Sequence, residues 1–410
     1  MSIKVPRISL RTAASVAAVA VAGALLVNGL SAGAGGTAQA ATPIRPAGAD
    51  ASFTTVFKST LPIEGLTGDR HGNLYTAGRG ADSCPITRVA SSGGAPALVG
   101  SLAAPCGPAG LTFDARGRLF VTNGDTISVL TPDPADPPTA AVFATGVPGA
   151  NGVAFDRDGN LWISDGTTGQ GRVWKVGPRG GSATEVFRVQ PMVNEVNVVN
   201  GVGGIGRDPR SLPPGSVTIT PNGRAAADTA GSQHLVANGL AFTPDGTLYV
   251  ADTARGAIWR VQLDRHGNLR SPVGCDTTFP ADTLCLDDVF VAHPYLEGSD
   301  GIALDRAGNI YSAANERNAI VVVTPTGRVV EFFRNLPDQA TSLRNQGPLE
   351  FPTSPFLTGS KLCITSSDGS RRDNFPNTGG EVGPNVPEHA KISCLDQPLA
   401  VPRAPLPVAR

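Results

Sequence analysis

One short pattern recurs along the sequence five times, and a sixth copy is degenerate. Each copy has a variable residue followed by Gly, an alternating apolar strand, a turn and a second strand. The turn reads Asp-x-x-Gly or Pro-Asp-Gly, and it predicts a tight reversal because Gly accepts positive φ and Asp bonds the turn backbone. The clear copies are EGLTGDRHGNLYTA from 64, AGLTFDARGRLFVT from 109, NGVAFDRDGNLWIS from 151, NGLAFTPDGTLYVA from 238 and DGIALDRAGNIYSA from 300. The sixth begins near Thr353 and runs to Asp368.

The spacing of the copies predicts an all-β fold, a six-bladed β-propeller over residues 53–397. A third strand is expected after several copies, at 172–176, 257–261 and 319–323, and units of three or four strands are typical of propeller blades. Gly and Pro together make 85 of 410 residues, which fits many short strands joined by turns. Residues 53–57 are expected to add the outer strand that closes the ring on the last blade.

The stretches that lack the pattern divide the rest of the chain. The interval between the third and fourth copies is 87 residues, and it contains no further copy. We therefore interpret residues 188–237 as an insertion into the propeller. Residues 41–52 are expected to form an N-terminal linker, and residues 398–410 a Pro-rich tail.

Residues 1–40 have the pattern of a secretory signal peptide. Lys4, Arg7 and Arg11 precede an apolar run from about Ala13 to Val27, and residues 38–40 form an A-x-A cleavage site. The run is short for a membrane span, so an N-terminal anchor is the less favoured alternative. The basic part contains no Arg pair, which favours the Sec-type route. Cleavage leaves 30 basic and 34 acidic residues, which suits a secreted, soluble protein and argues against a nucleic-acid partner.

All six cysteines follow the predicted cleavage site, and an even number in an exported chain indicates disulfides. Their spacing does not resemble a zinc site. Many pairings are open to six cysteines, and pairing between neighbours is our preference among them. The candidate pairs are Cys84 with Cys106, Cys275 with Cys285, and Cys363 with Cys394.

The residue before the Gly of each copy varies while the surrounding pattern is constant. The innermost strand of a blade lines the central channel, so these residues, which we call the hub residues, are expected to converge at one end of the axis. Two carboxylates and two amide oxygens form an all-oxygen shell that suits Ca²⁺ best, and Mg²⁺ or Mn²⁺ less well. A single Asn or Asp before Gly is an ordinary turn former, but Glu is not. The hub residues are Glu64, Ala109, Asn151, Asn238, Asp300 and approximately Thr353.

These motifs resemble the regucalcin/gluconolactonase-like family of six-bladed propellers, which is related to squid-type phosphotriesterase and the paraoxonases. The similarity lies in EGL at 64, NGV at 151, NGLAFTPDGTLYVADTARGAIWRV from 238 and DGIALDRAGNIYSA from 300. It covers about residues 60–335 well and the sixth blade poorly. The insertion and Ala109 depart from the family pattern, and no histidine matches the catalytic histidine of the paraoxonases.

The resemblance implies a divalent cation, often calcium, at the bottom of the channel. The glutamate that binds this cation in the family resembles Glu64, and the family's two asparagines resemble Asn151 and Asn238. The family's aspartate, which acts as base or nucleophile, resembles Asp300. Family activities are mainly hydrolysis of lactones and of some phosphoesters, so we expect a secreted, calcium-dependent hydrolase of a lactone or related ester.

Four further residues end the second strands of their blades on the hub side and are candidates for the substrate pocket wall. An aspartate at such a position also commonly ties its own blade together. The four are Asp165, Asp252, Asn315 and Asp368.

Two other functions stay open at this point. One is a binding propeller without chemistry, and the other is a lyase or strictosidine-synthase-like enzyme on the same fold. A binding module has no need to assemble the polar hub residues, which favours the hydrolase. We expect a small-molecule substrate, no membrane association after cleavage, and a monomer, because a closed ring has no long exposed strand edge.

Overall fold

The computed structural model describes residues 44–48, 50–190, 198–199, 202–203, 236–270, 281–336, 347–367 and 390–399. The predicted signal peptide, Asp368, Cys275, most of the insertion and residues 400–410 lie outside these ranges. No helix within the described ranges is long and apolar enough to cross a membrane.

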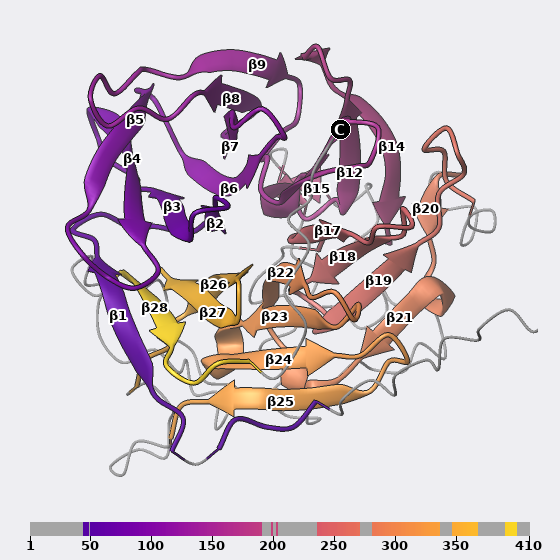
Figure 1. The fold of residues 1–410 in the computed structure, drawn as a ribbon. Helices are drawn as coiled ribbons and strands as arrows, with labels where there is room; N and C mark the ends of the chain where they lie inside the picture. The colour runs from indigo at the N-terminus through magenta and orange to yellow at the C-terminus, as the bar shows by residue number, and fades with distance from the viewer. Residues whose placement is uncertain are drawn as a thin grey trace, which may run out of the picture. The chain divides into compact units, whose positions relative to one another are not determined.

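Six antiparallel sheets, the blades, follow one another around a ring (Figure 1). Blade 1 contains β2 (Thr67–Gly68), β3 (Asn73–Ala77), β4 (Ser83–Ala90) and β5 (Ala97–Ala103). Blade 2 contains β6 (Pro108–Phe113), β7 (Leu119–Asn123), β8 (Thr126–Leu130) and β9 (Ala141–Thr145). Blade 3 contains β10 (Val153–Phe155), β11 (Leu161–Ser164), β12 (Arg172–Val176) and β14 (Thr184–Val189).

The second half of the ring repeats this order. Blade 4 contains β17 (Leu240–Phe242), β18 (Leu248–Asp252), β19 (Ala257–Val261) and β21 (Val289–Ala292). Blade 5 contains β22 (Ser299–Leu304), β23 (Ile310–Ala314), β24 (Ala319–Val323) and β25 (Val329–Arg334). Blade 6 contains β26 (Pro352–Thr358), β27 (Lys361–Ser366), β28 (Lys391–Leu395) and β1 (Phe53–Lys58). The six-bladed propeller predicted from the repeats is therefore confirmed.

A few short elements lie outside this regular pattern. Two strands add in parallel to outer edges, β13 (Gly181–Ser182) on β9 and β20 (Thr283–Leu284) on β14. The predicted insertion contains a small hairpin of β15 (Val198–Val199) and β16 (Val202–Gly203). The connections between strands include the 3₁₀ helices η1 (Gly166–Thr168), η4 (Leu286–Asp288), η5 (Pro294–Leu296) and η6 (Asn315–Arg317).

The ring closes as predicted, because the N-terminal strand β1 pairs antiparallel with β28 of the last blade. The disulfide Cys363–Cys394 then links β28 to β27, with the two Cα atoms 4.0 Å apart. A second disulfide, Cys84–Cys106, also matches a predicted pair. Cys285 is disulfide-bonded as well, while its predicted partner Cys275 lies outside the described ranges.

The Gly that follows five of the six hub residues is required because neighbouring blades approach closely there. The Gly110 amide donates to the Asn151 carbonyl at 3.0 Å, and the Gly239 amide donates to the Asp300 carbonyl at 3.1 Å. A Cβ atom on these glycines would overlap the carbonyl of the next hub residue. The same overlap holds at five steps around the ring, for Gly65, Gly110, Gly152, Gly239 and Gly301. Backbone contact therefore chains the hub residues together.

Hydroxyl groups from the second strands reinforce this chain of carbonyls. Thr122 Oγ1 donates to the Asn151 carbonyl at 2.9 Å, and Ser164 Oγ donates to the Asn238 carbonyl at 2.7 Å. Thr365 Oγ1 donates to the Glu64 carbonyl at 2.6 Å, so the last blade reaches back to the first. Each bond satisfies a backbone acceptor that the close approach would otherwise bury without a partner.

The Asp-x-x-Gly turns stand at the other end of the innermost strands. In blade 3, Asp156 Oδ1 accepts from the amides of Asp158 and Asn160, both at 2.9 Å. Its Oδ2 accepts from the Asn160 side chain at 2.8 Å and from Trp162 Nε1 at 2.9 Å. Gly159 has φ of 80°, which a residue without a Cβ adopts readily. The carboxylate thus fixes both the turn and the next strand.

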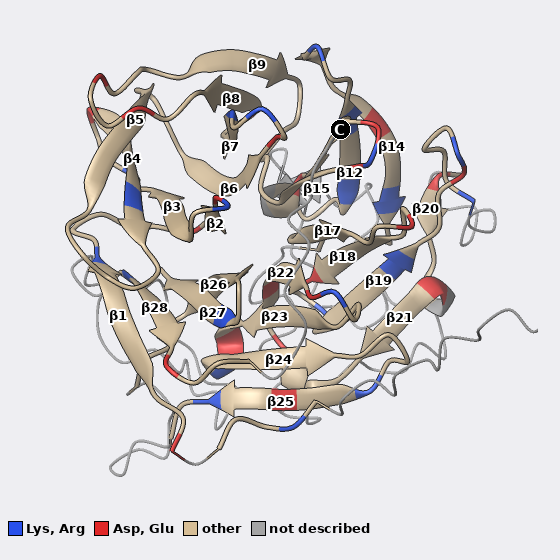
Figure 2. Cartoon of the chain, in the orientation of Figure 1, with Lys and Arg blue, Asp and Glu red and all other residues tan. Residues whose placement is uncertain are grey.

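The hydrophobic core lies between blades. Trp162, Trp259, Tyr311, Phe120 and Phe187 are among its largest fully buried side chains. The Trp162 ring packs edge-on against Phe242 of the next blade, with ring centroids 5.6 Å apart. Burial of such a side chain contributes about 1.5–3 kcal/mol. Lys, Arg, Asp and Glu fall mainly on turns and on outer strands such as β14 and β25 (Figure 2).

We expect the double variant Cys363→Ser/Cys394→Ser to lose about 2–5 kcal/mol of unfolding free energy, because the disulfide restricts the unfolded chain where the ring closes. Denaturant unfolding measures this loss. Limited proteolysis provides a second readout, because β1 should become cleavable in this variant and stay protected in Cys84→Ser/Cys106→Ser. An unchanged denaturation midpoint together with a protected β1 would contradict the expectation.

Candidate functional site

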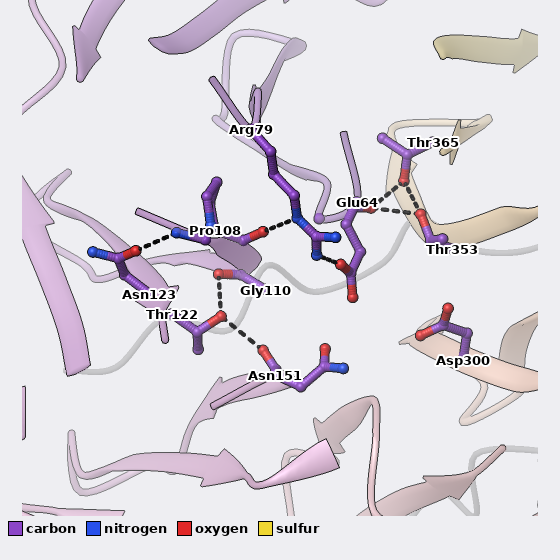
Figure 3. A network of polar contacts seen from close by, with 12 residues as sticks. Glu64, Arg79, Pro108, Gly110, Thr122, Asn123, Asn151, Asp300, Thr353 and Thr365 are labelled. Carbon is purple, nitrogen blue, oxygen red and sulfur yellow. Dashed lines mark hydrogen bonds and ion pairs between the residues drawn. The ribbon is translucent and has the colours of Figure 1, made fainter. Parts of the chain in front are cut away.

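The hub residues meet at one end of the channel, as the sequence predicts. Glu64, Asn151 and Asp300 come from three different blades, and their side chains point toward a common space (Figure 3). Asn151 and Asp300 are each 5 % exposed and Asn238 is 1 % exposed, whereas Glu64 is partly buried. Asn238 joins the group through a side-chain hydrogen bond to Asp300. Residues up to 236 positions apart are thus gathered by the ring of backbone contacts.

Asp300 is a buried carboxyl group of this cluster with a strongly raised pKa. Burial raises its pKa to about 7, against the lowering effect of hydrogen bonds from Asn315 and Asn238 and of the positive charge on Arg79. The Asn315 Nδ2 donates to Asp300 Oδ2 at 3.1 Å. Two amide side chains therefore fix the orientation of a carboxyl group whose ionised form is poorly solvated.

Arg79 is the site residue that the sequence prediction missed. Its guanidinium forms an ion pair with Glu64 Oε2, and its Nε donates to the Pro108 carbonyl at 3.0 Å (Figure 3). Burial lowers its pKa, and the Asp300 charge opposes that shift. Arg79 follows β3 by two residues, close to where other blades place Asp or Asn. Applying the strand-end rule to blade 1 would have drawn attention to this segment.

The strand-end candidates separate into two groups. Asn315 contacts Asp300 and so belongs to the cluster. Asp165 instead bonds Arg172, with Nε to Oδ2 at 2.5 Å and the backbone amide to Oδ1 at 2.9 Å. Asp252 bonds Arg255 Nη1 at 2.8 Å and Trp259 Nε1 at 3.0 Å. These contacts favour a blade-tying role for both aspartates, and Asp368 lies outside the described ranges.

The donor set fits a hard divalent cation. No group of three or more His, Cys, Asp or Glu side chains in the described ranges is placed to hold a metal. A cation at the hub therefore needs both carboxylates, Glu64 and Asp300, with amide oxygens of Asn151 and Asn238. Carboxylate and amide oxygens are the ligands that Ca²⁺ prefers. The Arg79 guanidinium pairs with Glu64, so a cation bound at the hub would have to displace Arg79 from this carboxylate.

The site can now be compared with known proteins. Residues 85–367, more than half of the chain, match the model of the SMP-30/Gluconolactonase/LRE-like region. A comparison of the sequence with curated proteins found no match.

Solved structures of low sequence identity share the fold. A calcium-binding regucalcin from Agrobacterium tumefaciens is 18% identical, with a TM-score of 0.53 over 88% of this chain and 98% of that one. A gluconolactonase from Xanthomonas campestris is 16% identical, with a TM-score of 0.52 over 88% of this chain and 99% of that one. A luciferin-regenerating enzyme is 14% identical, with a TM-score of 0.54 over 88% of this chain and 100% of that one.

Proposed function

Because the chain belongs to the SMP-30/Gluconolactonase/LRE-like family, we propose that it is an exported hydrolase of a lactone or related ester that depends on a divalent cation, Ca²⁺ in first place. The observation that carries this proposal is the convergence of Glu64, Asn151, Asn238 and Asp300 at one end of the channel. The gluconolactonase and the calcium-binding regucalcin among the similar structures support the reaction and the cation respectively.

In this proposal Asp300 either takes a proton from the attacking water or attacks the lactone carbonyl itself. Asn315 and Asn238 hold its carboxylate in one orientation, so the reacting oxygen needs little rearrangement. The cation would be held by Glu64, Asn151, Asn238 and Asp300. A cation bound there supplies Lewis-acid polarisation of the carbonyl oxygen.

Arg79 has a supporting role in the same mechanism. Its Nε bond to the Pro108 carbonyl anchors the side chain independently of Glu64. The guanidinium therefore stays at the hub when Glu64 turns to other partners, and it favours the carboxylate form of Asp300 and of the hydroxy-acid product.

Export is the second part of the proposal. The two disulfides Cys84–Cys106 and Cys363–Cys394 are compatible with an extracellular protein. They complement the basic and apolar pattern of residues 1–40.

We expect Glu64→Gln to weaken calcium binding by at least about tenfold, because it removes one of two ligand charges. Calorimetry with CaCl₂ on the chelator-treated protein measures this. A chelator should abolish hydrolysis across a panel of small lactones, and added Ca²⁺ should restore it. Glu185→Gln, on the outer strand β14, is the matched control and should bind like the wild type.

The outcomes separate the competing functions. Bound calcium without turnover of any lactone would indicate a structural cation and favour a lyase or another reaction. A folded protein that binds no divalent cation would contradict the proposal and leave a binding propeller.

A further inference from the structure

A large cavity lies at the end of the channel opposite the hub. Its volume is about 1220 Å³, which exceeds the range of roughly 300–1,000 Å³ that is usual for ligand pockets. Each innermost strand begins within three residues of a hub residue and leads to a turn, and the turns of five blades line this cavity. Glu64, Asn151, Asn238 and Asp300 do not line it. The cavity is therefore separate from the candidate catalytic site.

The inner walls of the cavity are largely apolar. Residues two positions beyond the hub residues form its inner end, and they stand between the cavity and the hub. These residues are Leu66, Leu111, Val153, Leu240 and Ile302. Phe242 and Leu304 continue the apolar lining toward the turns. An aliphatic chain placed here would leave water for a hydrophobic surface.

The rim of the cavity carries arginines. Arg70, Arg116, Arg157 and Arg306 occupy the turns of four blades, line the cavity and are at least partly exposed. Within the described ranges, the guanidinium groups of Arg70, Arg116 and Arg306 take part in no ion pair or hydrogen bond. Their donors are therefore available to a ligand.

The carboxylates of the same rim are already engaged. Asp69 accepts four hydrogen bonds, from the amides of His71 and Asn73 and from the Asn73 and Tyr75 side chains. Asp114, Asp156 and Asp305 accept corresponding bonds within their own turns, and Asp245 accepts from the Thr243 hydroxyl. Within the described part of the chain, the rim thus presents guanidinium donors without partners beside carboxylates whose acceptor positions are occupied within their own turns. This arrangement selects a ligand head group that accepts hydrogen bonds, and a carboxylate accepts them most strongly.

We propose that this cavity binds an anionic amphiphile of the long-chain carboxylate class. The carboxylate is held by the rim arginines, and the alkyl chain runs between the innermost strands. Arginine suits this head group because its planar fork can bond both carboxylate oxygens. This inference is independent of the proposed hydrolase function, because the two sites lie at opposite ends of the innermost strands and share no side chain.

The test measures the binding of dodecanoate to the full protein by calorimetry. The dodecanoate concentration is kept below its micellar concentration. We expect saturable binding that weakens at least about tenfold in Arg70→Gln/Arg116→Gln/Arg306→Gln, since each lost bond is charge-assisted. The charge-matched control is Arg45→Gln/Arg179→Gln/Arg265→Gln, which changes arginines that do not line the cavity and should bind like the wild type. Dodecanol, which has the same tail without the charge, should bind more weakly and respond equally to both triple variants.

A second variant tests the walls independently of charge. Ala303 lines the cavity and also packs against the core of blades 5 and 6, so Ala303→Phe adds a ring at the cavity wall. We expect this variant to lose dodecanoate binding while its far-UV circular dichroism stays unchanged. The proposal is overturned if the wild type shows no saturable binding. It is also overturned if the two triple variants bind equally, which would indicate nonspecific adsorption, or if folded Ala303→Phe binds like the wild type.

Discussion

Replacement of Asp300 by Asn is expected to lower kcat/KM for lactone hydrolysis by about 10²–10⁴-fold. Asn has nearly the same shape and keeps an oxygen toward Asn315, but it can neither accept a proton nor attack a carbonyl. Because burial raises the pKa of Asp300, its ionised form is unfavourable in the folded protein, so Asp300→Asn should leave the fold intact and raise stability or leave it unchanged. Steady-state kinetics on the calcium-saturated protein measures the effect.

The matched control for this prediction is Asp245→Asn. Asp245 is a carboxylate in the turn of blade 4, at the far end of the innermost strand, and its side chain contacts Thr243. It should change kcat/KM by less than about twofold. A folded, calcium-loaded Asp300→Asn that keeps wild-type turnover would remove Asp300 from the chemistry and leave it as a cation ligand alone.

Gly239→Ala is expected to destabilise the contact between blades 4 and 5. The added Cβ would meet the carbonyl oxygen of Asp300 at 2.5 Å and the Gly301 Cα and Ile302 amide nitrogen at 2.8 Å each, all backbone atoms that cannot turn aside. Overpacking of this kind lowers the free energy of unfolding by about 1–3 kcal/mol, or more where backbone must move. Chemical denaturation measures the loss.

The same substitution should act on the site as well as on stability. It forces blade 4 away from blade 5, and with it Asn238 away from Asp300, so calcium affinity should fall together with the midpoint of unfolding. Gly177→Ala is the control, since a Cβ there meets nothing within 4 Å and no positive φ is needed. If Gly239→Ala were as stable as Gly177→Ala, close packing would not explain the Gly of the repeated pattern.

The repeated hairpins were predictable because their signals are local. An Asp or Pro-Asp, a Gly and flanking apolar residues determine each turn and both of its strands, and the third strands at 172–176, 257–261 and 319–323 match β12, β19 and β24. Apart from the closing strand at 53–57, which matches β1, the fourth strands were not located. β9 and β5 carry exposed apolar residues such as Val142 and Leu98 and lie at blade edges, so their sequences lack a strict alternation.

The hub was predictable in part, for a related reason. Symmetry of the repeats places the residues before each Gly near one axis, but it says nothing about side chains from other strands. Arg79 reaches Glu64 because the segment after β3 passes the Pro108 carbonyl of the next blade, a contact between blades that no local pattern records. The requirement for Gly likewise depends on the neighbouring blade's backbone and could not be deduced from one copy.

The pairing of β1 with β28 sets the order in which this protein can mature. Thr54 Oγ1 bonds Asp396, 342 residues later in the chain, so the contact that completes blade 6 has nearly the largest sequence separation available. High contact order slows folding, and here the closing contact does not exist until the ribosome has passed residue 396. The first five blades are therefore synthesised before β28, and β1 has no partner strand until then. The disulfide Cys363–Cys394 cannot form before Cys394 has been made, so the covalent closure of the ring follows the synthesis of the first five blades.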